Sequence, residues 1–117
     1  MSHREQFIWK RGIQLSVLCY QLTKHFPNSE LYGLTSQIRR SAVSVPSNIA
    51  EGYGRVSKAE YIRFLQIALG SLRELDTQLI IAKEVGLADP NLFISVMKDV
   101  DDLQRIMVST LQKLQNN

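Results

Sequence analysis

Cysteine is nearly absent from this chain, and its one cysteine, Cys19, cannot form an intrachain disulfide. A lone thiol usually behaves as a small apolar side chain, and its use is typical of a reducing compartment. Long apolar runs are also missing, since no stretch approaches the roughly 18 residues needed to cross a bilayer. The first residues lack the apolar core of a secretory signal. We therefore expect a cytoplasmic protein without a membrane partner.

Strong charge of one sign is lacking as well. The formal charge of +3 comes from 14 Lys and Arg against 11 Asp and Glu, too little to indicate a polyanionic partner by itself. The charges are unevenly distributed, because residues 1–75 hold ten basic and five acidic side chains whereas the remainder holds four and six. This asymmetry is compatible with one basic surface for nucleic acid, although helical proteins often show as much by chance.

Proline and glycine are few, at three and six residues, and most lie between stretches whose apolar residues recur at helical spacing. The whole chain, residues 1–117, fits a single domain. Short connections leave no residues for long crossovers, so the pattern predicts an all-α fold, an antiparallel up-down four-helix bundle. The predicted helices span about residues 4–24, from Ser29 or Thr35 to about 51, 58–85, and from Asp89 onward.

The first predicted helix has an unusually wide apolar arc. Its apolar side chains cover more than half of the circumference and leave Lys10, Gln14 and Gln21 for water. A helix in an isolated bundle needs a stripe of roughly 100°. The excess favours burial against a second subunit, and a central position within one bundle is the alternative. The side chains that would form the subunit interface are Trp9, Ile13, Val17 and Tyr20.

Two residues are unusual inside predicted helices. Pro46 lacks the N–H that would bond to the carbonyl of Ala42, so we expect the second helix to bend or restart there. Gly70 lies in the middle of the third helix, where glycine costs about 1 kcal/mol relative to alanine. It either permits close approach of a neighbouring helix or is tolerated at the surface.

The start of the third helix has the clearest local pattern. Ser57 and Glu60 have the spacing of a capping box, and Val56 with Tyr61 fits a hydrophobic staple. Gly86 is expected to end this helix in a left-handed conformation. Its predicted core seam alternates spacings of four and three: Tyr61, Leu65, Ala68, Leu72, Leu75, Leu79 and Ala82. The last helix continues the core with Val96, Val100, Leu103, Met107 and Leu114, and Phe93, Met97, Ile106 and Leu111 add apolar surface beyond that stripe.

The segment from Leu31 to Gly52, which reads LYGLTSQIRRSAVSVPSNIAEG, resembles the signature of a bacterial four-helix-bundle family. That family includes proteins encoded within intervening sequences of the large-subunit ribosomal RNA gene. The resemblance continues through Glu60-Tyr61 and residues 64–75 and covers nearly the whole chain. It implies an antiparallel four-helix bundle that assembles as a ring, commonly a homopentamer. The family's link to ribosomal RNA comes mainly from gene location, so RNA binding does not follow from membership.

Some distant relatives of this family assist reverse transcriptases of diversity-generating retroelements. That role calls for a strongly basic protein, and this chain carries only a mild positive charge. We keep a reverse-transcriptase accessory role as a minor alternative.

Few residues could perform catalysis. His25 lies six residues from Cys19, a spacing that does not make them neighbours on a helix. The acidic cluster at residues 99–102 has Arg105 close by on the same helix, so a solvated face explains it. We therefore expect no catalytic residue, no metal site, no cofactor and no small-molecule substrate.

Several residues are candidates for binding RNA. Forked guanidinium donors match phosphate oxygens, and an exposed tyrosine can stack on an unpaired base. Structural ion pairs are the alternative: Arg39 with Glu51 or Glu74, and Arg63 with Glu60. The candidates are Arg40, Tyr53, Arg55, Lys58, Arg63 and Arg73.

These patterns together predict a non-enzymatic binding or scaffold protein that forms a homo-oligomeric ring, with RNA as the leading ligand class. In a ring, several copies of a weak basic patch could engage one polyanion with avidity. The rival hypothesis is an assembly module that binds no nucleic acid.

Overall fold

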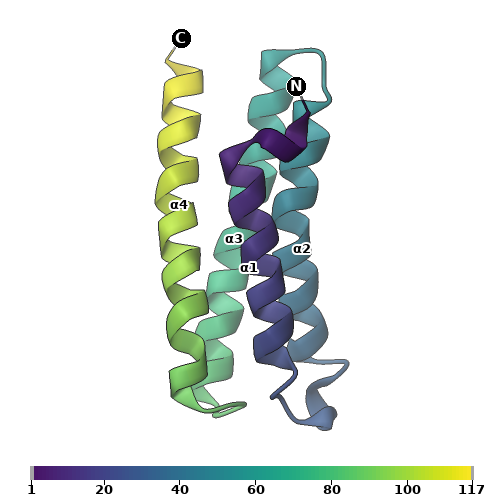
Figure 1. Ribbon diagram of the computed structural model, residues 1–117, viewed down its shortest axis with the longest axis vertical. Helices are drawn as coiled ribbons and strands as arrows, with labels where there is room; N and C mark the ends of the chain where they lie inside the picture. The colour runs from purple at the N-terminus through teal and green to yellow at the C-terminus, as the bar shows by residue number, and fades with distance from the viewer. Residues whose placement is uncertain (1, 117) are drawn as a thin grey trace.

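The computed structural model describes residues 2–116 as a bundle of four α-helices with alternating directions (Figure 1). Within this range no β-strand occurs. The helices α1 and α3 each pack against both α2 and α4. This arrangement confirms the all-α, antiparallel up-down bundle predicted from the sequence. The helices are α1 (Phe7–Thr23), α2 (Leu34–Tyr53), α3 (Lys58–Glu84) and α4 (Ile94–Gln115), and short 3-10 helices at His3–Glu5, Asn28–Glu30 and Pro90–Phe93 precede α1, α2 and α4.

The two ends of α3 are set by local hydrogen bonds. At its start the Ser57 hydroxyl accepts from the Glu60 N–H at 3.1 Å, so the serine half of the predicted capping box is confirmed. The hydrophobic staple is wrong, because Val56 lies in the turn with its side chain wholly in solvent. At the other end Gly86 has a φ of +75°, and the Leu87 N–H donates to the Ala82 carbonyl at 3.1 Å. This is the left-handed ending that the glycine predicts.

The start of α2 differs from both predicted caps. Gly33 occupies the position before the helix, and the Leu34 N–H donates to a Glu30 carboxylate oxygen at 3.1 Å. Ser29 falls within a 3-10 turn, and Thr35 is buried inside the helix. The carboxylate of Glu30 thus accepts from a free N–H at the start of α2. A serine or threonine hydroxyl was expected in this capping role.

The first and last helices begin later than predicted. Gln6 is extended and separates the 3-10 turn at His3–Glu5 from α1. Asp89 does accept from the Asn91 N–H at 2.9 Å, as its capping position predicts. The turn that follows is a 3-10 helix, however, and α4 itself begins at Ile94.

The core follows the predicted seam of α3 closely. Its residues from Leu65 to Ala82 are buried, and only Tyr61 stays half-buried, where its hydroxyl accepts from the Gln6 side-chain amide at 2.9 Å. Phe93 and Leu111 are part of this core and not an addition to it. Gly70 is exposed, and a Cβ placed on it would meet nothing within 4 Å. Within one subunit, therefore, Gly70 is a surface glycine.

Helix α2 runs through Pro46 without a restart, and α1 places a hydroxyl beside the carbonyl that lacks its helical N–H. The buried Ser16 hydroxyl lies 3.0 Å from the Gly12 carbonyl of its own helix and 3.0 Å from the carbonyl of Ala42, the group that a residue with an N–H at position 46 would bond. Gly12 lets the two helices come this close, since a Cβ on it would lie 3.1 Å from the Pro46 Cβ. A bend at Pro46 stays a prediction.

Candidate interaction surfaces

One side of α1 remains uncovered by the rest of the chain. Ile13, Val17 and Tyr20 are exposed by 39, 51 and 43 %, and Trp9 is half-buried with its ring edge against His3. The alternative of a central position for α1 within one bundle is therefore wrong. All four side chains predicted for a subunit interface lie on this side of α1, and their role in an interface stays a prediction.

This uncovered side continues onto α2 and forms two adjoining hollows. One is a groove of about 520 Å³ lined by Tyr20, Leu31, Tyr32, Thr35, Ser36, Arg39, Arg40 and Val43. The other is a hollow of about 250 Å³ lined by Trp9, Ile13, Ser16, Val43, Pro46, Ser47 and Ala50. Val43 belongs to both, so they form one surface. We call this surface the α1/α2 face; its exposed apolar side chains are Ile13, Val17, Tyr20, Leu31, Tyr32 and Val43.

Leu31 and Tyr32 were not among the predicted site residues, although Tyr32 is 93 % exposed. They lie just before α2, in a turn that helical periodicity does not describe. The signal that could have found them is two large apolar side chains between a 3-10 turn and a glycine.

Arg39 lies at the edge of the groove, where two residues of α1 fix its side chain. Its Nε donates to the Thr23 hydroxyl at 2.8 Å, and its guanidinium lies 4.5 Å from the centre of the Tyr20 ring. The predicted pairing with Glu51 or Glu74 is wrong. Twelve residues of helix, about 18 Å, separate Arg39 from Glu51. Glu74 reaches α2 from the α3 side, where it accepts from the Ser41 hydroxyl at 2.6 Å.

The six candidate RNA-binding residues do not form one patch. Arg40 is exposed on the α1/α2 face and makes no ion pair with any described residue. Arg73 lines a hollow between α3 and α4 together with Val108 and Leu111. The remaining four lie near the turn between α2 and α3: Tyr53, Arg55, Lys58 and Arg63.

The basic side chains near the α2–α3 turn have acidic neighbours. Arg55 forms an ion pair with Glu51, and Arg63 pairs with Glu60 at 3.3 Å, as predicted. Both guanidinium groups also lie over the Phe64 ring, at 4.9 and 4.7 Å from its centre. Beside them is a hollow of about 270 Å³, lined by Gln6, Gly52, Tyr53, Arg55, Val56, Ser57, Lys58 and Tyr61. The positive charge near this hollow is thus partly neutralised by Glu51 and Glu60 of the same chain.

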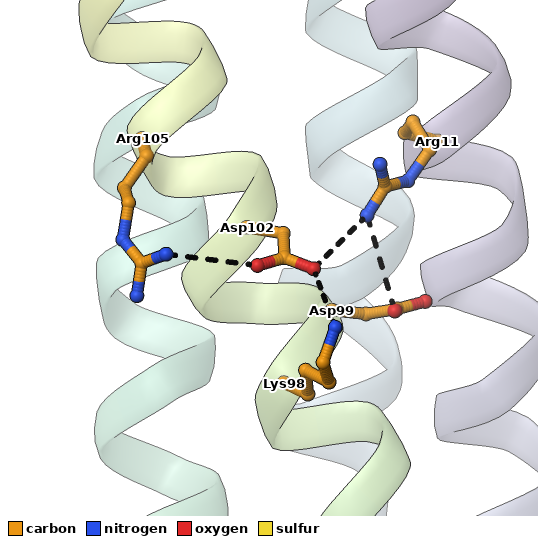
Figure 2. A network of polar contacts seen from close by, with 5 residues as sticks. All are labelled: Arg11, Lys98, Asp99, Asp102 and Arg105. Atoms are coloured by element: carbon orange, nitrogen blue, oxygen red, sulfur yellow. Dashed lines mark hydrogen bonds and ion pairs between the residues drawn. The ribbon is translucent and has the colours of Figure 1, made fainter.

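A polar network links α1 to α4 on the side away from α2 (Figure 2). The Arg11 guanidinium lies 3.9 Å from an Asp99 oxygen and 3.8 Å from an Asp102 oxygen. Asp102 also contacts Lys98 at 3.4 Å and Arg105 at 3.8 Å. The contact with Arg105 follows from helical spacing, but no pattern along the chain indicated Arg11 as a partner. The acidic cluster thus joins two helices.

Cys19 is buried among the core side chains. Burial raises the pKa of the Cys19 thiol to about 12, so the nucleophilic thiolate is scarce at neutral pH. His25 is exposed, and no group of His, Cys, Asp and Glu between residues 2 and 116 is arranged to hold a metal ion. In the same range no helix is long and apolar enough to cross a membrane.

Comparisons with known proteins agree on the family and the fold. A family model described as 23S rRNA-intervening sequence protein matches residues 4–109. The chain is also similar to the crystal structure of a protein with unknown function from the S23 ribosomal protein family of Bacteroides thetaiotaomicron VPI-5482. The TM-score is 0.79 at 20 % identity, over 89 % of this chain and 97 % of that one. No curated protein matches the chain.

Proposed function

We propose that this chain, which belongs to the 23S rRNA-intervening sequence protein family, is a non-enzymatic binding protein that assembles with its own copies. The observation that carries this proposal is the α1/α2 face. Its apolar side chains lie on two packed helices and a preceding turn, so they form a continuous surface instead of scattered contacts. Contiguous apolar surfaces on small proteins commonly mark interaction sites.

The composition of the α1/α2 face supports a protein partner. Aromatic residues and arginine are enriched at the centres of protein interfaces, and this face offers Trp9, Tyr20 and Tyr32 with Arg39 and Arg40. Arg39 is already fixed by Thr23 and by the Tyr20 ring. Less side-chain freedom is then lost when a partner binds. The resemblance to ring-forming relatives makes further copies of this chain the partner we propose, in a homopentameric ring.

Mass measurements on variants test this assembly. We expect wild-type protein to have a multiple of the 13.4 kDa chain mass by light scattering. Ile13→Asp should reduce that mass to a monomer, because it places a charge in the proposed interface. Ile94→Asp is the matched control, since Ile94 is 63 % exposed but lies at the start of α4, away from this face. A monomeric wild type, or a variant Ile13→Asp that keeps the parental mass, would contradict the proposal.

RNA is the second candidate ligand of the assembled protein. It is supported by the concave surface at the α2–α3 turn, where Arg55 and Lys58 adjoin Tyr53. The ion pairs of Arg55 and Arg63 are solvent-exposed and therefore weak, so phosphate oxygens can displace their carboxylate partners. Several copies of such a surface in one ring would add their contributions.

Salt dependence separates RNA binding from pure assembly. Fragments of 23S ribosomal RNA should bind at low ionic strength and dissociate steeply as salt rises, because phosphate contacts release counterions. The double variant Arg55→Glu with Lys58→Glu should lose this binding while keeping its helical content. Lys113→Glu, near the end of α4, is the control for a change of charge alone. RNA binding that is absent, or unchanged in the double variant, would leave the assembly module as the whole function.

A further inference from the structure

The solvent side of α3 carries a second stripe that lies largely outside the contacts of the bundle, although its Glu74 accepts from the Ser41 hydroxyl of α2. Its residues alternate spacings of three and four, as the core seam does, so they stay on one side along the helix. Two of them are isoleucines that are 40 % and 46 % exposed. We call this stripe the α3 outer face; it consists of Ile67, Gly70, Glu74, Thr77, Ile81 and Glu84.

We infer that the α3 outer face is the surface on which the α1/α2 face of a second copy docks. Neighbouring subunits would then meet through two different faces, head to tail. This inference rests on the proposed self-assembly and deepens it by assigning the complementary surface.

Charge favours contact between unlike faces. The α1/α2 face carries Arg39 and Arg40 at the edge of its groove. If two such faces met with their helices parallel, these cations would lie at the same level, and juxtaposed like charges disfavour an interface. The α3 outer face carries Glu84, and at its edge Glu74, which accepts from the Ser41 hydroxyl of α2; neither carboxylate is in an ion pair with any described residue. Arginines meeting glutamates would complement each other.

The charges also lie toward the same end of the bundle. Arg39 and Arg40 are in the second turn of α2, and Glu84 is the last residue of α3. In Figure 1 the start of α2 and the end of α3 are both at the lower end of the molecule. Two copies that stand side by side in the same orientation would therefore bring these charges to similar levels.

Gly70 provides an independent reason to place a neighbour against this helix. It lies at an exposed position in the interior of α3, where glycine weakens helical structure, and a Cβ on it would meet nothing within 4 Å in its own subunit. A helix without a side chain at this point allows the backbone of a second copy to approach closely. The position of Gly70 between Ile67 and Glu74 puts this gap within the α3 outer face.

A head-to-tail contact has a consequence that a two-fold contact lacks. Each copy keeps one face of each kind, so contacts can continue from copy to copy until a ring closes. Damage to either face should stop assembly, yet a copy damaged in one face can still pair with a copy damaged in the other.

The decisive experiment mixes two variants. Ile13→Asp damages the α1/α2 face and Ile81→Asp damages the α3 outer face, so light scattering should find each alone to be a monomer. Mixed in equal amounts they should form a dimer of one copy of each, with twice the monomer mass. Ile94→Asp should keep the wild-type mass.

The variant Gly70→Gln tests whether a loss of assembly could be caused by misfolding instead of by damage to the α3 outer face. This change adds a side chain to the α3 outer face and improves the helix, so assembly should be lost while circular dichroism and thermal stability of the monomer are kept or raised. If wild type assembles and Ile13→Asp is monomeric, but Ile81→Asp and Gly70→Gln keep the wild-type mass, this inference is wrong and the proposed function stands. A monomeric wild type overturns both.

Discussion

Helix α1 is held in two different ways by its two neighbours. Toward α2 the contact is made at the level of the backbone, with Gly12 against Pro46 and the Ser16 hydroxyl against the Ala42 carbonyl. Toward α4 the long Arg11 side chain spans the gap to Asp99 and Asp102 (Figure 2). Backbone atoms cannot move aside, whereas long side chains readjust. The first contact should therefore tolerate far less change than the second.

The contact between α1 and α2 also gives a structural role to Pro46, which lies in the segment from Leu31 to Gly52 that resembles the family. Pro46 removes a donor, Ser16 replaces it from another helix, and Gly12 provides the space. The three residues thus form one structural unit at the base of the α1/α2 face, which fixes how α1 and α2 present their exposed side chains. Ser16 and Pro46 also line the smaller hollow of that face, so they shape the surface that we propose a second copy contacts.

The largest effect is expected from filling the space at Gly12. Gly12→Leu should lower the free energy of unfolding by about 3 kcal/mol, because a side chain there is forced against the ring of Pro46. When both variants are made in the Ile13→Asp background, in which the chain is expected to be monomeric, Gly70→Ala is the matched control. It should raise the free energy of unfolding by up to about 1 kcal/mol, since that position is open within one subunit and alanine favours helix. Urea denaturation at one fixed protein concentration measures both. If Gly12→Leu and Gly70→Ala changed the free energy of unfolding equally, the contact between Gly12 and Pro46 would not be the tight backbone contact described above.

A smaller loss should follow from removing the Ser16 hydroxyl. Ser16→Ala leaves the buried carbonyl of Ala42 without a partner and should cost about 2 kcal/mol. In the background of Pro46→Ala, the restored N–H bonds that carbonyl, so the same serine change should cost only about 0.5 kcal/mol. A double-mutant cycle in urea measures this coupling. Additive costs would show that Ser16 does not act for the missing N–H.

The α4 side should respond weakly. Arg11→Ala should cost no more than about 1 kcal/mol, as is usual for partly exposed ion pairs, and the cost should shrink in high salt. Lys10→Ala, at the exposed neighbouring position, should have no measurable effect. A salt-independent loss from Arg11→Ala that rivals the loss from Gly12→Leu would reverse the comparison of the two contacts.

The smallest effect concerns Asp76, between α3 and α4. Burial, and then the nearby Asp101 carboxylate, raise the pKa of Asp76 above its ordinary value. The folded state thus binds the proton more tightly than the unfolded state, and the contribution of Asp76 to stability is lost as pH rises through its folded-state pKa. Asp76→Asn should stabilise the protein at pH 7 by at most about 0.5 kcal/mol, with no gain below a pH of about 4. Thermal unfolding of the wild type and of Asp76→Asn between pH 3 and pH 7 would measure this gain, with the pH limits taken roughly from the ordinary pKa of an aspartate. A stabilisation by Asp76→Asn that is larger at low pH than at pH 7 would contradict the raised pKa of Asp76.

The sequence was most informative where one helix carries its own pattern. The seam of α3 and the cap at Ser57 follow from spacing along a single segment, and both are as predicted. The wide arc of α1 likewise predicted more apolar surface than one bundle covers, and Ile13, Val17 and Tyr20 are exposed. The start of α2 was missed because its capping group, Glu30, acts across a turn whose geometry is not periodic.

The candidate site shows the same division. Arg63 with Glu60 was found because helical spacing fixes that distance. The contacts of Arg39 with Thr23 and of Arg11 with Asp99 were not predicted. Each of these pairs joins two helices, and the sequence pattern of one helix does not determine how it is rotated relative to the other. For that reason the six basic and aromatic candidates, which the sequence could only enumerate, separate onto different sides of the bundle.

By itself the sequence determined the helices, their order, the buried seam and the surplus apolar surface of α1, because these depend on spacing within one segment and on short connections. Only the tertiary structure decided that the Ser16 hydroxyl lies beside the carbonyl that Pro46 leaves without its helical N–H, that the groove beside Tyr20 is edged by arginines, and that Gly70 faces away from its own subunit. These features depend on how each helix is rotated toward its neighbours, and that rotation is set by the packing of all four helices together.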